Sequence, residues 1–226
     1  MSEIRILASV ADLDEARVVL EADADIIDLK NPAAGALGAL STGIVAEIVA
    51  AVVRKRPVSA TVGDLPMLPE IVIPAVRVMA TTGVEYVKLG FFPGDDWSGV
   101  LDGLRPLAGE IRLVAVLFGD DAPGLEWVDR IAAAGFAGAM LDTRDKARGS
   151  LRTVCDGKYL RGFVASVQAA GMLCGLAGSL RLEDIPKLAA LKPDYLGFRG
   201  ALCGGARTHR VEREAVMELV AEVHRR

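Results

Sequence analysis

An amine and a carboxylate close an apolar segment near the start of the chain. In ADIIDLKNP, residues 24–32, Asp28 and Lys30 follow a pair of isoleucines. Residues two apart in a strand point to the same side, so we expect an ion pair surrounded by apolar walls. A second apolar segment, EYVKLG at residues 85–90, brings Lys88 to the same relative height. Burial and a neighbouring ammonium both lower a lysine pKa, which yields the neutral amine that attacks a carbonyl.

Two further ionisable groups follow a later apolar segment. GAMLD, residues 138–142, ends in Asp142, and the following TRDK brings Lys146 into the next loop. Together with Lys30 and Lys88 they fit a Schiff-base enzyme in which one lysine is the nucleophile and the other carries protons. Taken alone, a lysine at a strand end is more often a solvated side chain than a catalyst, and an aspartate before a turn is usually a cap.

Glycine-rich segments late in the chain indicate a phosphate site. They are LAGSL (176–180) and FRGALCGGAR (198–207). Glycines let backbone N–H groups approach an anion closely, and ordinary loop geometry is the alternative reading. The predicted phosphate-binding residues are Gly178, Ser179, Arg199, Gly200, Gly204 and Gly205.

Polar residues in two other segments are candidates for substrate or metal binding. SATVGDLP (59–66) contains Thr61 and Asp64, which could bind substrate or cap the next helix, and we expect the first. GDDAPG (119–124) holds adjacent carboxylates, but no further ligand at a fixed spacing accompanies them. We therefore expect a solvated loop there, no metal and no cofactor.

The elements that position these residues alternate regularly. Apolar strand segments lie at 4–9, 25–30, 57–62, 85–90, 112–117, 138–142, 172–178 and 194–200. Amphipathic helical segments separate them; examples are 12–22, with Asp12 as N-cap, 124–135, closed by Gly135, and about 209–225.

This alternation predicts an α/β fold, a single (β/α)₈ TIM barrel over residues 1–226. A doubly wound sheet is disfavoured because no GxGxxG fingerprint follows the first strand. In such a barrel the C-terminal strand ends form the active-site face, and alternate strands share a layer of side chains. The charged groups of the second, fourth and sixth strands should therefore meet at one rim.

Composition excludes several classes of protein. The chain has 226 residues, 52% of them hydrophobic, with a net charge of −4, and its basic residues form no one-sided cluster before the final turn. We expect no nucleic-acid partner, and no membrane span or signal peptide is apparent. Three widely spaced cysteines fit a reduced, cytoplasmic protein. We also expect a homo-oligomer.

Six segments, in chain order, resemble the (5-formylfuran-3-yl)methyl phosphate synthase family of methanofuran biosynthesis. They are ADIIDLKNPAAGALGA (24–39), VSATVGDLP (58–66), YVKLGF (86–91), AMLDT (139–143), LAGSL (176–180) and GFRGALC (197–203). The resemblance implies a barrel enzyme that condenses two molecules of glyceraldehyde 3-phosphate, releasing phosphate and water.

The same resemblance implies residue roles. Lys30 corresponds to the Schiff-base lysine and Lys88 to the proton-transfer lysine, while Asp142 and Lys146 match further catalytic groups. Asp28 matches the carboxylate of the first motif and is expected to hold Lys30 in place. The segment GGARTHRVE, 204–212, departs from the family pattern, which leaves the contacts to the second phosphate open.

Two other functions share these sequence features. One is a class I aldolase-like or triose-phosphate isomerase-like barrel enzyme, and the other is a non-catalytic barrel that binds sugar phosphates. Product analysis separates them, because only the synthase forms a furan.

Overall fold

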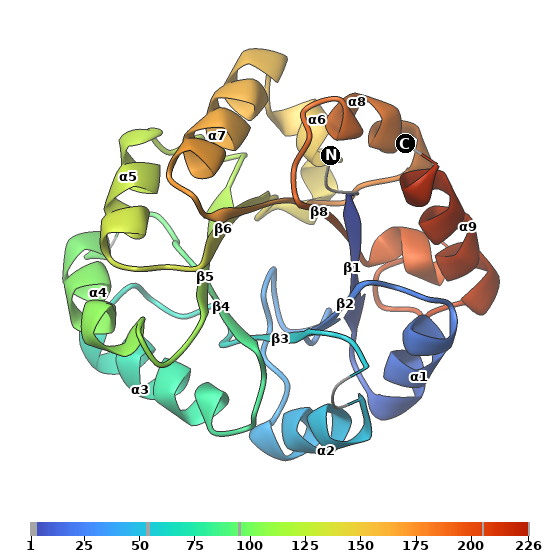
Figure 1. Ribbon diagram of the computed structural model, residues 1–226, viewed down its shortest axis with the longest axis horizontal. Coiled ribbons are helices and arrows are strands. Elements are labelled where there is room, and N and C mark those ends of the chain that lie inside the picture. Colours follow the sequence, from blue (N-terminus) through green and yellow to red (C-terminus); the bar gives the residue numbers. More distant parts are fainter. Residues whose placement is uncertain (1–3, 53–54, 95, 205, 226) are drawn as a thin grey trace.

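Parallel strands form a closed barrel in the computed structural model, which describes residues 4–52, 55–94, 96–204 and 206–225 (Figure 1). The strands follow chain order around the barrel, and β8 pairs with β1. They are β1 (Arg5–Val10), β2 (Ile26–Leu29), β3 (Val58–Thr61), β4 (Tyr86–Gly90), β5 (Leu113–Phe118), β6 (Gly138–Asp142), β7 (Leu173–Leu176) and β8 (Tyr195–Phe198). The predicted barrel is thus confirmed, and the doubly wound sheet is wrong.

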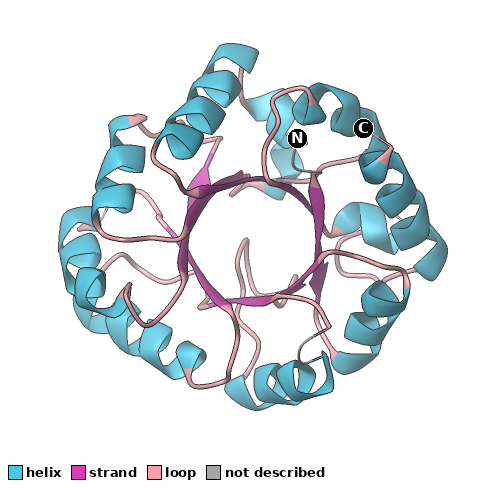
Figure 2. Cartoon of the chain, in the orientation of Figure 1, coloured by secondary structure: helices cyan, strands magenta, loops and turns pink. Residues whose placement is uncertain are grey.

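Helices surround the barrel as an outer ring (Figure 2). The α-helices are α1 (Leu13–Glu21), α2 (Thr42–Val52), α3 (Pro69–Ala80), α4 (Trp97–Leu104), α5 (Glu126–Ala133), α6 (Leu151–Val154), α7 (Gly157–Ala169), α8 (Ile185–Ala189) and α9 (Arg213–His224). Short 3₁₀ helices are η1 (Arg105–Leu107), η2 (Lys146–Arg148), η3 (Leu182–Asp184) and η4 (Gly200–Cys203). Within the described residues, no helix has both the length and the apolar character needed to cross a bilayer.

The ends of several elements follow from local contacts. Asp12 caps α1 as predicted, because its carboxylate accepts the Glu15 N–H at 2.8 Å. The last helix starts at Arg213 instead of near residue 209. The preceding segment is a loop because Arg199 donates to the backbone carbonyls of Arg207 and His209, so these residues are held outside the helix.

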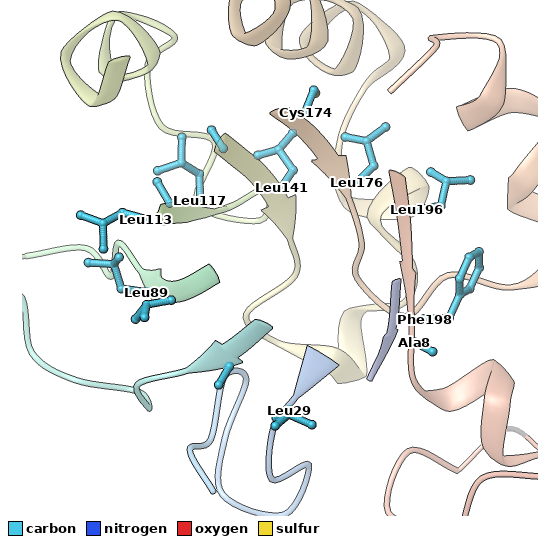
Figure 3. Close-up of a cluster of buried hydrophobic side chains, with 14 of the residues drawn as sticks. Ala8, Leu29, Leu89, Leu113, Leu117, Leu141, Cys174, Leu176, Leu196 and Phe198 are labelled. Carbon is cyan, nitrogen blue, oxygen red and sulfur yellow. The ribbon is translucent and has the colours of Figure 1, made fainter. Parts of the chain in front are cut away.

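The strands are largely apolar on both faces because each face is buried against a different layer. Side chains such as Leu89, Leu141 and Leu196 point outward into the layer between barrel and helices (Figure 3). Each leucine buried in this way contributes about 1.5–3 kcal/mol. A second cluster, which includes Val114 and Tyr195, fills the barrel interior.

The barrel interior becomes polar near the middle of β2. Asp28 lies opposite Ser9 of β1 and Ser59 of β3 in the strand register. All three side chains point inward and are buried, with at most 2% of their surface exposed. The apolar interior of the barrel thus ends in a polar layer, above which lies the mouth formed by the C-terminal strand ends.

Candidate active site

A cavity of about 620 Å³ opens at the C-terminal end of the barrel. Its walls come from β1, β2, β4, β6 and β8 and from the loops after β6, β7 and β8. The active-site candidates that line it are Asp28, Lys30, Lys88, Asp142, Lys146, Gly178, Ser179, Arg199 and Gly200. The structure therefore brings these predicted residues together at one rim.

Lys30 follows β2 directly and is 7% exposed. Its backbone N–H donates to the Val10 carbonyl at 3.1 Å, which fixes the start of the side chain. Within the described residues, its amine has neither a hydrogen-bond acceptor nor a carboxylate at salt-bridge distance. Burial lowers the pKa of Lys30 from 10.5 to about 8, and nearby Asp142 counteracts part of this effect. An amine of this kind is suited to nucleophilic attack on a carbonyl.

Asp28 pairs with Lys88, and the predicted ion pair between Asp28 and Lys30 is wrong. The Lys88 Nζ lies 2.9 Å from Asp28 Oδ1, and both side chains are almost fully buried. Lys30 stands two residues after Asp28, just beyond the end of β2, and its side chain belongs to the layer nearer the mouth. Lys88 instead reaches Asp28 from the other side of β3.

Two hydroxyl groups complete the surroundings of Asp28. Ser59 donates to Asp28 Oδ1 at 2.6 Å, and Ser9 donates to Oδ2 at 2.9 Å. Burial alone would raise the pKa of Asp28, but Lys88, Lys30 and the Ser59 hydroxyl hold it below its ordinary value. The carboxylate therefore stays ionised and keeps its positive partner beside the cavity.

Asp142 and Lys146 form a second charged pair at the end of β6. Lys146 Nζ donates to Asp142 Oδ1 and to the Thr143 carbonyl. Asp142 Oδ1 also accepts the Thr143 N–H at 2.7 Å. Burial would raise the pKa of Asp142, but Lys146, Lys30 and these hydrogen bonds lower it to about 2. Asp142 is thus an anion that acts on Lys30 electrostatically without binding it.

The turn after β7 has the geometry of an anion cradle. Gly178 has φ +107°, and a Cβ there would lie 2.8 Å from the Thr143 backbone nitrogen. Ser179 also has a positive φ, +47°, which is an unfavourable conformation for a residue with a side chain. Within the described part of the chain, the backbone N–H groups of Gly178 and Ser179 have no acceptor. Two free donors at the rim fit the predicted phosphate site, and phosphate binding there stays a prediction.

Gly200, Gly204 and Gly205 follow β8. Gly200 lines the cavity and opens η4. Gly204 is exposed, ends η4 with φ +64° and is not part of the cavity wall. Gly205 lies outside the described residues.

Arg199 lines the cavity, but its guanidinium has no donor left for a phosphate. An arginine has five N–H donors. Two of the bonds from Arg199 go to the Glu15 carboxylate, at 2.5 and 3.1 Å, and one goes to the Ser9 carbonyl at 3.1 Å. The remaining two hold the carbonyls of Arg207 and His209. The contacts therefore correct the predicted role of Arg199: it anchors the loop after β8 instead of meeting an anion.

Thr61 and Asp64 hold the loop between β2 and α2. The buried Thr61 hydroxyl donates to the Gly38 carbonyl at 3.1 Å, and Asp64 accepts the N–H groups of Ala36 and Leu37 at 2.8 and 2.7 Å. Neither residue lines the cavity. A direct contact of either residue with substrate stays a prediction.

The acidic loop after β5 is used for local structure. Asp120 accepts the backbone N–H groups of Arg144 and Asp145, both at 2.8 Å. Asp121 forms an ion pair with the Arg144 guanidinium. These contacts fasten the loop after β5 to the loop after β6.

Comparison with known proteins settles the family. The profile of the 4-HFC-P synthase family matches residues 6–220. The chain belongs to this family.

Two relatives and one solved structure illustrate the relationship. The (5-formylfuran-3-yl)methyl phosphate synthase of Methanosarcina mazei is 33% identical over 231 residues, covering 97% of this chain and 99% of the relative. A Methylorubrum extorquens protein, provisionally given the same name, is 43% identical over 199 residues, covering 88% of this chain and 82% of that protein. The crystal structure of phosphoribosyl anthranilate isomerase from Thermotoga maritima has a TM-score of 0.71 at 12% identity, covering 97% and 98% of the two chains. At this low identity, the similarity shows the fold alone.

The sequence reasoning missed several residues that shape this member of the 4-HFC-P synthase family. Ser9 and Ser59 could have been found, because each is a polar residue in an apolar strand and shares the inward parity of its strand. Glu15 lies in the segment predicted as the first helix, where its sequence position gave no sign that it pairs with Arg199. Arg207 lines the cavity from an irregular loop, where no periodicity marks it.

Proposed function

We propose that the chain is a (5-formylfuran-3-yl)methyl phosphate synthase that joins two molecules of glyceraldehyde 3-phosphate through a Schiff base on Lys30. The sum of atoms requires the release of one phosphate and two water molecules. Family membership supports the product, because a relative that spans nearly the whole chain carries this name. The buried, unpaired amine of Lys30 supports the mechanism.

The three lysines of the cavity differ in their partners. Lys88 forms an ion pair with Asp28, and Lys146 forms one with Asp142, so each of these amines is already bound to a carboxylate. Lys30 lacks such a partner within the described residues, and its pKa of about 8 leaves roughly a tenth of the amine neutral at pH 7. Lys30 is therefore the best nucleophile of the three.

Attack by Lys30 on a triose phosphate gives an iminium ion and releases water. The iminium acidifies the neighbouring carbon, and loss of a proton there gives an enamine that can form the new carbon–carbon bond. Lys88 and Asp142 lie beside the cavity on either side of β5 and are the groups we assign to proton transfer. Elimination of phosphate, ring closure, loss of water and hydrolysis of the imine then free Lys30 and the product.

Borohydride trapping tests the assignment. Reduction in the presence of glyceraldehyde 3-phosphate should add a triose-derived mass to the peptide that contains Lys30, and untreated enzyme should release phosphate and form a furan aldehyde that absorbs in the near ultraviolet. Lys30→Met should lose all three signals. Lys158→Met removes an exposed lysine of α7 and should keep them.

Two results would reject parts of the proposal. An active preparation in which Lys30 stays unmodified would reject the Schiff base. An adduct at Lys30 without phosphate release or a chromophore would indicate a simple aldolase or isomerase instead of a synthase.

A further inference from the structure

The proposed reaction consumes two anions, and the cavity needs positive charge for both. Six basic side chains line it: Lys30, Lys88, Lys146, Arg181, Arg199 and Arg207. Lys88 and Lys146 are neutralised by aspartates, and Arg199 is neutralised by Glu15. Arg181 is 76% exposed and lies 3.9 Å from Glu183. Apart from the nucleophile, this leaves Arg207 as the partly buried cation without a carboxylate partner in the described cavity.

Arg207 links two loops at the rim of the barrel. Its backbone lies in the loop after β8, whereas its Nη2 donates to the Gly35 carbonyl in the loop after β2, at 2.8 Å. Its remaining guanidinium N–H groups have no acceptor within the described residues. Burial lowers the pKa of Arg207, while Asp142 and Asp64 act on it in the opposite sense. The guanidinium thus lies within the electrostatic range of both β6 and the loop after β3.

Arg199 holds the backbone of Arg207. The Arg199 Nε donates to the Arg207 carbonyl at 2.8 Å, and Nη2 donates to the His209 carbonyl at 2.8 Å. The Glu15 carboxylate orients the same guanidinium and accepts the Val211 N–H at 3.2 Å. The loop after β8 is therefore held at the backbone groups of Arg207, His209 and Val211, and Arg207 lines the cavity from this fixed loop.

We propose that Arg207 binds the phosphate of the second triose phosphate, the one not held by the turn at Gly178 and Ser179. The inference rests on the proposed condensation, which brings two phosphate groups into one cavity. A guanidinium can bind a phosphate with two parallel hydrogen bonds, and Arg207 has free N–H groups for them. The second phosphate then lies between the loops after β2 and β8, and Arg199 is a positioning residue for this contact.

Binding stoichiometry tests the site independently of catalysis. Glycerol 3-phosphate carries the phosphate but no carbonyl, so it cannot form a Schiff base. Wild-type protein should bind two molecules per chain in calorimetric titration, and Arg207→Gln should bind one. The matched control is Arg210→Gln, because Arg210 belongs to the same loop but is exposed and faces Asp12 and Asp14 instead of the cavity. It should still bind two.

Kinetics provide a second measurement. Arg207→Gln should raise the KM for glyceraldehyde 3-phosphate by roughly tenfold to a hundredfold, the usual size of a lost charged hydrogen bond. Borohydride should still trap one triose at Lys30, because the first molecule binds elsewhere. Arg207→Lys keeps the positive charge but loses the planar guanidinium, so its KM should lie between those of wild type and Arg207→Gln. This variant tests the site if Arg207→Gln does not fold.

The outcomes separate this site from the proposed function. If Arg207→Gln binds two glycerol 3-phosphate molecules and has the same KM as Arg210→Gln, the role of Arg207 is overturned, while furan synthesis stands. Two molecules bound to wild type and one to Arg207→Gln, with no furan from wild type, would support the site and reject the function. Binding of a single molecule to wild type would overturn the inference.

Discussion

Lys30 combines burial with the absence of a bound carboxylate. Asp142 and Asp28 raise its pKa from a distance, Lys146 and Lys88 lower it, and burial has the largest effect. The reactivity of this amine therefore depends on several neighbours that do not bind it, which makes its ionisation a sensitive measure of the site.

The rate of Schiff-base formation should rise with pH and level off above about pH 8, where Lys30 is mostly neutral. Lys146→Met should move the midpoint upward, because it removes a cation that lowers the pKa of Lys30 and leaves Asp142 without its main partner. Initial rates of borohydride-trapped adduct between about pH 6 and pH 10 measure this. A wild-type midpoint near 10.5 would contradict the burial argument.

Lys30 should also destabilise the fold that contains it. The fall of its pKa from 10.5 to about 8 corresponds to about 3 kcal/mol at neutral pH. Between about pH 8 and pH 10.5 the unfolded chain binds more protons than the folded one, so wild-type stability should rise with pH across this window. Lys30→Met should therefore be more stable by up to about 3 kcal/mol at pH 7, and the gain should shrink toward pH 10.5.

Denaturant unfolding at the two pH values measures this gain. Lys158→Met, on the exposed face of α7, should change stability by no more than about 0.5 kcal/mol. A less stable Lys30→Met at pH 7 would show that Lys30 is a structural residue.

Among the elements, the loop between β2 and α2 depends on a distant carboxylate. Asp64 accepts the N–H groups of Ala36 and Leu37 and thereby holds the loop that meets Arg207 at Gly35. A Cβ on Gly35 would lie 2.1 Å from Asp64 Oδ2, so the loop passes very close to this carboxylate. The Gly35 carbonyl that Arg207 contacts is therefore positioned by a carboxylate that does not line the cavity.

Asp64→Ala should loosen this loop without removing a catalytic group. We expect faster amide hydrogen exchange at Ala36 and Leu37 and a loss of about 1–3 kcal/mol for the hydrogen bonds. The matched control is Asp156→Ala, because Asp156 also accepts two backbone N–H groups but at the start of α7. It should leave exchange at residues 36 and 37 unchanged. Unaltered exchange in Asp64→Ala, with weaker substrate binding, would support direct substrate contact instead.

The contrast between strands and loops explains what could be predicted. Strands buried on both faces are nearly continuous apolar runs, so their positions were evident within a few residues. Lys30 and Lys88 were found because an ionisable group in such a run is exceptional. The loops after β2 and β8 are held by Asp64 and Arg199 through bonds to distant backbone groups, and no local pattern encodes such contacts. The pairing of Asp28 with Lys88 was missed because it depends on how strands β2 to β4 curve around the barrel.

At the scale of the whole molecule, Asp28 joins four neighbouring strands. It lies on β2, accepts hydroxyl groups from β1 and β3, and pairs with Lys88 of β4. A buried carboxylate without its cation is strongly unfavourable, whereas loss of both partners can be nearly neutral. Half of the barrel therefore depends on one buried charge pair.

A double-mutant cycle should show strong coupling in this pair. Lys88→Met should destabilise the protein by about 3–5 kcal/mol, and adding Asp28→Asn should restore much of the loss. The control cycle uses Glu21→Gln and Arg213→Met, an exposed ion pair of 2.7 Å, for which about 1 kcal/mol or less is expected. Denaturant unfolding of all variants measures both cycles. Additive effects of the Asp28 and Lys88 substitutions would contradict the structural role.

The buried pair also has an evolutionary consequence. A descendant that no longer needed the chemistry could replace its nucleophile by one substitution and gain stability. It could not abandon Asp28 or Lys88 separately without endangering its folding. Homologues that have lost the original activity should therefore retain both Asp28 and Lys88 and carry an apolar residue at position 30.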